Sequence, residues 1–126
     1  MAIDPSGRDL KTFLAQDDGE PVVMLNLLRF KPGGRESYNR YAEAVATTFL
    51  PKVGGRVIYA GSGDTALVAE QGQAWDAVLL VHYPSRQAFS QMVADPEYQQ
   101  VTHLRTEALE EAVLQPTTGW PESPRA

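Results

Sequence analysis

Two stretches of the chain are almost continuously apolar, and they predict the buried strands of a sheet. PVVMLNLLRF spans residues 21–30, and WDAVLLVHY spans residues 75–83. A strand that is buried on both faces lacks the apolar–polar alternation of a surface strand. Both stretches are therefore expected to be central strands. Shorter extended stretches at residues 56–60 and 112–115 predict the other two strands.

Helices are predicted where apolar residues recur three and four positions apart. A short helix is expected over residues 6–16. A longer one is expected over residues 36–50, ended by Pro51 and the glycines that follow. The face of this longer helix that should be buried carries Tyr38, Tyr41, Ala42, Val45 and Phe49.

The segment after the second apolar stretch contains two helix starts. Ser85 follows a proline that cannot donate into a strand ladder, and it suits the N-cap of a helix over residues 86–93. Asp95-Pro96-Glu97 then combines a capping carboxylate, a proline in the first turn and a second acid near the positive end of the helix dipole. A second helix is therefore expected to begin there.

The predicted elements follow the order helix, then β-α-β-β-α-β. Right-handed crossovers turn this order into an α+β, ferredoxin-like fold, a four-stranded antiparallel sheet with helices on one face. The uncovered face would be too apolar for a monomer, so a symmetric homodimer through the sheets is expected. We divide the chain into an N-terminal helical extension (residues 1–20), the ferredoxin-like dimeric α/β-barrel domain (21–116) and a loosely ordered tail (117–126).

Composition narrows the class of protein. A length of 126 residues suits one domain, and the absence of cysteine excludes disulfides and thiolate chemistry. A net charge of −5 argues against nucleic acid, which requires a basic surface. No apolar run approaches the roughly 20 residues that span a membrane, and no signal peptide is recognisable at the start. A cytoplasmic protein with no membrane partner is expected.

Three stretches together resemble a known family: ESYNRYAEAV, VGGRVIYAG, and WDAVLLVHYPSRQAF followed by DPEYQQ and Arg105. The family is a small bacterial domain-of-unknown-function family, numbered thirteen-thirty, in the dimeric α/β-barrel superfamily. The resemblance implies the ferredoxin-like topology and the dimer. It implies no activity, because the family brings none that is established. The helix at residues 6–16 is an addition to its pattern, and His82 stands where such proteins more often carry an acid.

Two polar residues inside the apolar strands are the candidate catalytic residues. Asn26 lies among leucines and a methionine, where an unpaired carboxamide costs about 1–3 kcal/mol, so it is either a substrate-orienting amide or a group bonded to a loop. His82 is either a general acid or base near neutral pH or a histidine satisfied at a strand end or dimer seam. The hypothesis of catalysis requires both side chains to reach one cavity.

Three further residues are candidate substrate contacts. Tyr38 and Tyr41 are expected to pack in the core, with hydroxyl groups that reach a polar cleft. Arg105 lies among apolar helix positions, where a guanidinium requires a carboxylate. Either an internal acid such as Glu107 or Glu70, or an anionic ligand, would satisfy it.

These residues predict a homodimeric protein that binds or converts a small, partly apolar organic molecule in a pocket between sheet and helices. The alternative is an interaction or structural module without small-molecule chemistry. An enzyme of this kind would carry out cofactor-independent proton transfer or oxygenation, which is an analogy at the level of fold. No metal site and no cofactor are expected, because the two histidines lack ligand-like spacing to each other or to an acid.

Overall fold

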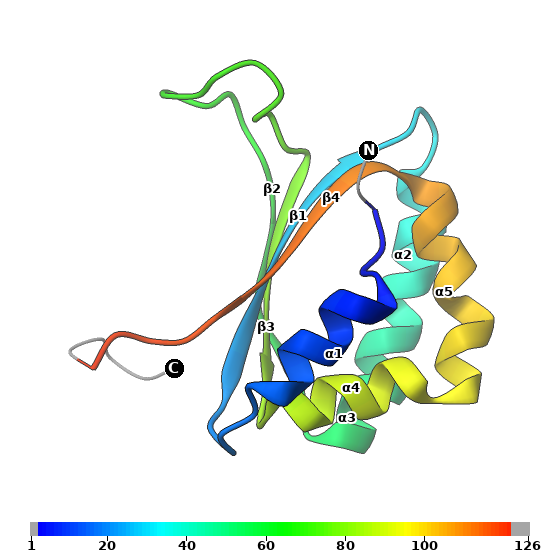
Figure 1. Cartoon of the computed structure of the whole chain (residues 1–126). Coiled ribbons are helices and arrows are strands. Elements are labelled where there is room, and N and C mark those ends of the chain that lie inside the picture. The colour runs from blue at the N-terminus through cyan, green and yellow to red at the C-terminus, as the bar shows by residue number, and fades with distance from the viewer. Residues whose placement is uncertain (1–2, 122–126) are drawn as a thin grey trace.

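The computed structural model describes residues 3–121 and folds as one sheet with a layer of helices against it (Figure 1). The elements follow the order helix, then β-α-β-β-α-β, with each helical crossover divided into shorter helices. In chain order they are α1 (Gly7–Ala15), β1 (Val22–Phe30), α2 (Arg35–Ala44), the π-helix η1 (Val45–Phe49), α3 (Leu50–Val53), β2 (Arg56–Ser62), β3 (Ala77–Tyr83), α4 (Arg86–Ala94), α5 (Pro96–Ala108) and β4 (Leu109–Thr117).

The sheet has four strands in the order β2-β3-β1-β4, and every neighbouring pair is antiparallel. The two apolar stretches form β1 and β3 at the centre, as predicted. All helices lie on the same side of the sheet, and the opposite side has no helix against it (Figure 1). The α+β, ferredoxin-like fold predicted from the sequence is therefore confirmed.

Burial along β1 shows which face of the sheet the helices cover. Val22, Met24 and Leu28 are at most 2 % exposed, whereas Val23 and Leu25 between them are only half-buried. Side chains alternate between faces along a strand, so the fully buried set faces the helices. The other set belongs to what we call the open face, which is apolar at its centre: Val23, Leu25, Leu27, Val78, Leu80 and Val113.

The helix after β1 continues further than predicted. Pro51 does not end it but stands in the first turn of α3, where its missing N–H removes no required hydrogen bond. The helix ends instead at Gly54, whose φ of 74° forms a left-handed cap. Tyr38, Tyr41 and Phe49 are buried, as predicted from their helical spacing. The π-helical turn at Val45–Phe49 was not predicted, because it leaves no mark in the hydrophobic pattern.

Two strands are longer than their sequences suggested. β2 extends to Ser62, and its irregularity falls between Val57 and Tyr59 rather than at the glycines that follow. β4 begins at Leu109 and includes nine residues, because it pairs with β1 along nearly its whole length. Residues 66–70 form no strand and belong to the loop between β2 and β3.

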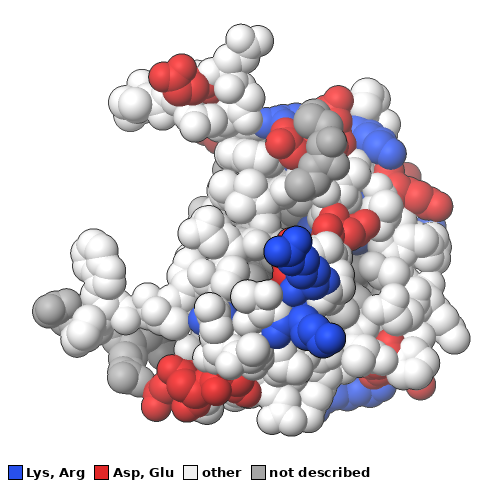
Figure 2. Space-filling view, viewed as in Figure 1, with Lys and Arg blue, Asp and Glu red and all other residues white. Residues whose placement is uncertain are grey.

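Two segments project beyond the sheet on the side of its open face. They are the loop of residues 63–76 and the chain after β4, which includes Trp120 with 79 % of its surface exposed (Figure 1). The recess between them is bordered mainly by residues other than Lys, Arg, Asp and Glu (Figure 2). Half of the predicted tail, residues 122–126, lies outside the described residues.

The N-terminal helix α1 packs on α4 through Phe13, whose ring meets that of Phe89 edge to face at 5.5 Å. Ser6 caps α1 by accepting a hydrogen bond from the Asp9 backbone N–H. No residue of α1 is fully buried. Residues 3–16 therefore lie on the domain and contribute little to its core.

Candidate functional site

A cavity of about 330 Å³ lies between the helix-covered face of the sheet and the helices. On β1 the fully buried row is interrupted at Asn26, which is only partly buried and lines this cavity. Leu79 of β3 and Leu114 of β4 lie beside Asn26 in register and line the cavity as well. Tyr38 and Tyr41 form part of its opposite wall, as the sequence predicted for a pocket between sheet and helices.

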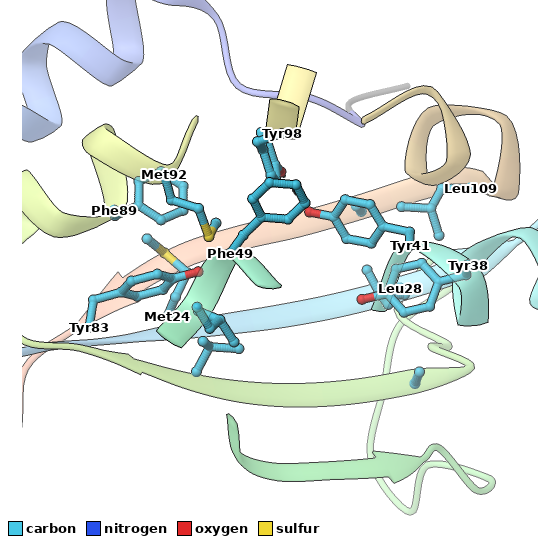
Figure 3. Close-up of a cluster of buried hydrophobic side chains, with 14 of the residues drawn as sticks. Met24, Leu28, Tyr38, Tyr41, Phe49, Tyr83, Phe89, Met92, Tyr98 and Leu109 are labelled. Carbon is cyan, nitrogen blue, oxygen red and sulfur yellow. Dashed lines mark hydrogen bonds between the residues drawn. The ribbon is translucent and has the colours of Figure 1, made fainter. Parts of the chain in front are cut away.

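Four tyrosines from three elements surround this space (Figure 3). Tyr38 and Tyr41 come from α2, Tyr83 from the end of β3 and Tyr98 from the first turn of α5. The hydroxyl oxygens of Tyr41 and Tyr98 are 2.6 Å apart and form a buried hydrogen bond. Tyr38 and Tyr83 extend toward each other from opposite ends of the cluster, over Met24 and Leu28 (Figure 3).

Aromatic packing holds these rings in place. Phe49 meets Tyr98 edge to face with centroids 5.6 Å apart, and Phe89 meets Tyr83 in the same way at 5.2 Å. Edge-to-face pairs contribute about 0.5–1.5 kcal/mol beyond the area that they bury. The hydroxyl groups are therefore presented from a rigid aromatic framework.

Burial keeps the tyrosines protonated. Removal from water raises the pKa of Tyr38 to about 12, although the nearby Arg105 charge lowers it in part. Burial also raises the pKa of Tyr41 and Tyr83 well above the ordinary value. At neutral pH these side chains are hydrogen-bonding hydroxyls and not phenolate bases.

Asn26 keeps most of its hydrogen-bonding capacity for the cavity. Its Nδ2 donates to the Met24 carbonyl at 3.3 Å, a long bond two residues back along the same strand. The loop that was the alternative explanation for this residue makes no hydrogen bond with it in the described part of the chain. The carboxamide is therefore available to a bound molecule, as the functional interpretation of the sequence required.

Arg105 lies on the cavity wall with only 6 % of its surface exposed. Its Nη1 donates to the Ile3 carbonyl and to Asp4 Oδ1, each at 2.7 Å. The prediction of an internal acid is confirmed, but the two examples that the sequence suggested, Glu107 and Glu70, are not the partner. The partner is Asp4, from the segment before α1, which chain folding brings to α5 from about a hundred residues away.

His82 is not part of this site. It pairs with Val23 across the β1–β3 ladder, and directly opposed residues share a face of the sheet. His82 therefore lies on the open face, whereas Asn26 lies on the helix-covered face beside Leu79. The catalytic pair proposed from the sequence, His82 as base with Asn26 as stabiliser, is not assembled within one chain. His82 Nδ1 is shielded from solvent and makes no hydrogen bond within residues 3–121.

Sequence reasoning missed Tyr83, Tyr98 and Asp4 as cavity residues. Nothing in the sequence around Tyr98 shows that its hydroxyl is buried, because that hydroxyl bonds to Tyr41 on another helix. Asp4 lies in a polar N-terminal segment, and no local sequence pattern indicates that it pairs with a helix residue. Between Ile3 and Pro121, no three His, Asp or Glu side chains form a cluster that could hold a metal ion. The same residues contain no helix long and apolar enough to span a membrane.

Comparison with known proteins relates the whole chain to solved structures. A protein of unknown function from Rhodopseudomonas palustris is 31 % identical, with a TM-score of 0.85, and the match covers 94 % of this chain and 96 % of that one. A putative antibiotic biosynthesis monooxygenase from Bacteroides thetaiotaomicron is 20 % identical, with a TM-score of 0.56 and coverage of 83 % and 92 %. No curated protein matches the chain.

A third solved structure shares the fold alone. It is a dimeric protein of unknown function with a ferredoxin-like fold from Bacteroides fragilis, 14 % identical, with a TM-score of 0.52 and coverage of 77 % and 94 %. The family model described as "Domain of unknown function (DUF1330)" matches residues 27–115, which is most of the chain. The family predicted from the sequence is thereby confirmed, and the chain belongs to the DUF1330 family.

Proposed function

We propose that this protein binds a small, partly apolar organic molecule in the cavity between sheet and helices. The observation that carries the proposal is the group of polar side chains on a mainly apolar wall: the Asn26 carboxamide, the Tyr38 hydroxyl and the Arg105 guanidinium. Cavities of about 300–1,000 Å³ with this composition are the usual form of a small-molecule site.

Binding is favoured over chemical conversion. A general base must come within hydrogen-bonding reach of the proton that it removes, and His82 lies on the other face of the sheet. The raised pKa values of Tyr38 and Tyr41 keep their hydroxyls protonated, so these residues donate hydrogen bonds rather than accept protons. Within residues 3–121, Asp4 is the one carboxylate on the cavity wall, and it is already paired with Arg105.

We also propose that two copies of this protein form a homodimer through the open face. Six aliphatic side chains of this face remain half-buried in the single chain, and a second copy would remove them from water. The two projecting segments carry exposed Leu67, Val68 and Trp120 on the same side, where they would extend over a second copy (Figure 1). The dimeric ferredoxin-like relative from Bacteroides fragilis supports this arrangement by analogy. Location in the cytoplasm stays a prediction from the sequence.

Native mass spectrometry of freshly purified protein tests both parts of the proposal. We expect the mass of two chains, a fraction of which carries an added small molecule. Asn26→Leu should reduce the retained fraction, because it removes the carboxamide from the cavity. Gln91→Leu, the same exchange on the exposed surface of α4, serves as the control. A dimer without retained mass would favour the alternative of an interaction module without a ligand. Retention that Asn26→Leu leaves unchanged would show that the molecule is not held by Asn26 and would contradict the proposed site.

A further inference from the structure

Arg105 has hydrogen-bonding capacity that the protein itself does not use. Its side chain is 7 % exposed, and its Nη1 is satisfied by Ile3 and Asp4. Its Nη2 is shielded from solvent and has no partner within the described residues. A guanidinium presents its donors as a planar fork that matches a carboxylate with two parallel hydrogen bonds. In this protein only one branch of the fork is occupied.

The carboxylate that balances the charge of Arg105 lies outside the part of the chain that the family model matches. Asp4 precedes residues 27–115, which the family model matches, whereas Arg105 lies within them. The Asp4 side chain is 44 % exposed, and the helix that follows it buries no residue completely. Exposed segments with few buried contacts open at low free-energy cost. The partner of Arg105 is therefore the more easily displaced member of the pair.

The other polar groups on the cavity wall favour a ligand rich in acceptors. Of the two hydroxyls in the Tyr41–Tyr98 bond one donates to the other, so one proton is left to donate elsewhere. The Tyr38 hydroxyl makes no hydrogen bond within residues 3–121, so it also has a proton to donate. A buried anion requires such donors together with a compensating cation. Tyr38, Tyr41 and Arg105 all line the same cavity.

We propose that the ligand carries a carboxylate, which binds Arg105 in place of Asp4 when the segment before α1 moves aside. This inference rests on the proposed function of the cavity and specifies the class of its ligand. Displacement is required by charge, because Asp4 and Arg105 already form a neutral pair. A second carboxylate beside that pair would be an uncompensated negative charge in a site with little water. Nη2, which has no partner within the described residues, would supply the second hydrogen bond to the carboxylate.

Isothermal titration calorimetry with a matched pair of probes tests this proposal. 4-Phenylbutyrate and 4-phenylbutyramide share the same apolar part, and only the first is charged at pH 7. We expect the acid to bind more tightly than the amide. Arg105→Gln should weaken binding of the acid about ten- to a hundredfold, the range of hydrogen bonds to a charged group, and should remove the preference for the acid.

Asp4→Asn provides the sharper test, because it removes the competing charge without altering the cavity. We expect this variant to bind the acid several-fold more tightly and to bind the amide as the native chain does. A several-fold change is on the order of the free energy of a partly exposed ion pair. Asp9→Asn is the matched control, since it makes the same exchange in α1 at an exposed carboxylate that forms no ion pair with Arg105. Arg40→Gln, at an exposed arginine of α2, is the control for Arg105→Gln.

The outcomes separate this inference from the function on which it rests. Equal binding of acid and amide, unchanged by Asp4→Asn, would overturn the carboxylate and the displacement while a small-molecule site remained. Tighter binding of the amide would do the same and would indicate a neutral carbonyl ligand. If neither probe bound the native chain or the Asp4→Asn variant, and native mass spectrometry showed no retained molecule, both proposals would be wrong.

Discussion

The hydrogen bond between the hydroxyls of Tyr41 and Tyr98 offers a direct test of how the cavity wall is built. The two oxygens are 2.6 Å apart, and the residues are 8 % and 7 % exposed. Tyr41→Phe removes one hydroxyl, keeps the ring packing and leaves the Tyr98 hydroxyl without its partner. Tyr98→Phe does the reverse. The double variant removes both groups together.

The expected magnitudes follow from the asymmetry of buried hydrogen bonds. A buried polar group that loses its partner costs about 1–3 kcal/mol, whereas replacing both partners with apolar groups of the same shape is nearly neutral. We expect each single variant to lower the free energy of unfolding by about 1–2 kcal/mol. The double variant should lose less than either single variant, which corresponds to a coupling of at least about 1 kcal/mol, within the range for residues in contact.

Urea unfolding followed by circular dichroism measures these differences at one fixed protein concentration, because the proposed dimerisation would make the free energy of unfolding depend on concentration. With a slope of about 1–3 kcal/mol per molar urea, the single variants should shift the midpoint downward by on the order of 0.5–1 M. Additive effects would refute the reasoning, since they would mean that the two hydroxyls do not depend on each other. Single variants as stable as the native chain would also refute it, because the orphaned hydroxyl would then be satisfied by water in the cavity.

Three further predictions concern the open face, a helix cap and alkaline pH. Leu25→Arg, at the centre of the open face, places a charge in the proposed interface and should convert the dimer to a monomer in size-exclusion chromatography with light scattering. Gln91→Arg on α4 should leave the dimer unchanged. If the Leu25→Arg variant remained a dimer, this face would be excluded as the interface. Ser85→Ala removes the side-chain cap that accepts from the Ala88 N–H and should lower the free energy of unfolding by about 1 kcal/mol in urea, and an unchanged midpoint would contradict this. The pKa of Tyr38 is about 12 in the folded chain and 10 when unfolded. The contribution of the protonated Tyr38 to the free energy of unfolding is therefore complete below pH 10, and it falls by on the order of 2–3 kcal/mol as the pH rises toward 12. Tyrosinate absorbance that reached its full amplitude below pH 11 without unfolding would contradict this burial.

The local elements of the fold were predictable because their signals are local. Ser85 and Asp95 cap their helices through hydrogen bonds to backbone groups two or three residues away, and such caps can be recognised from a few consecutive residues. The apolar runs of β1 and β3 predicted central strands, since two-sided burial leaves no polar alternation to find. The length of β4 was missed because pairing with β1, not its own composition, keeps Leu109 and Glu111 in the strand.

The sequence allowed some of the residues that line the cavity to be predicted, but not how the side chains come together there. Tyr38, Tyr41, Asn26 and Arg105 were identified because each is a polar or amphipathic group at a position whose pattern predicts burial, and all four line one cavity. His82 met the same criterion and lies elsewhere. Even-numbered positions of β1 pair with odd-numbered positions of β3, and that register places His82 and Asn26 on opposite faces. A shift of one residue would have put them together.

The sequence by itself therefore determined which segments become strands and helices, and which residues leave water. The structure of the whole chain decided the strand register, the pairing of Asp4 with Arg105 and the meeting of Tyr41 with Tyr98. The physical reason is the range of the interactions. Propensity, capping and hydrophobic periodicity act over a few residues, whereas register and ion pairing join groups that come together only when the sheet and its helices have packed.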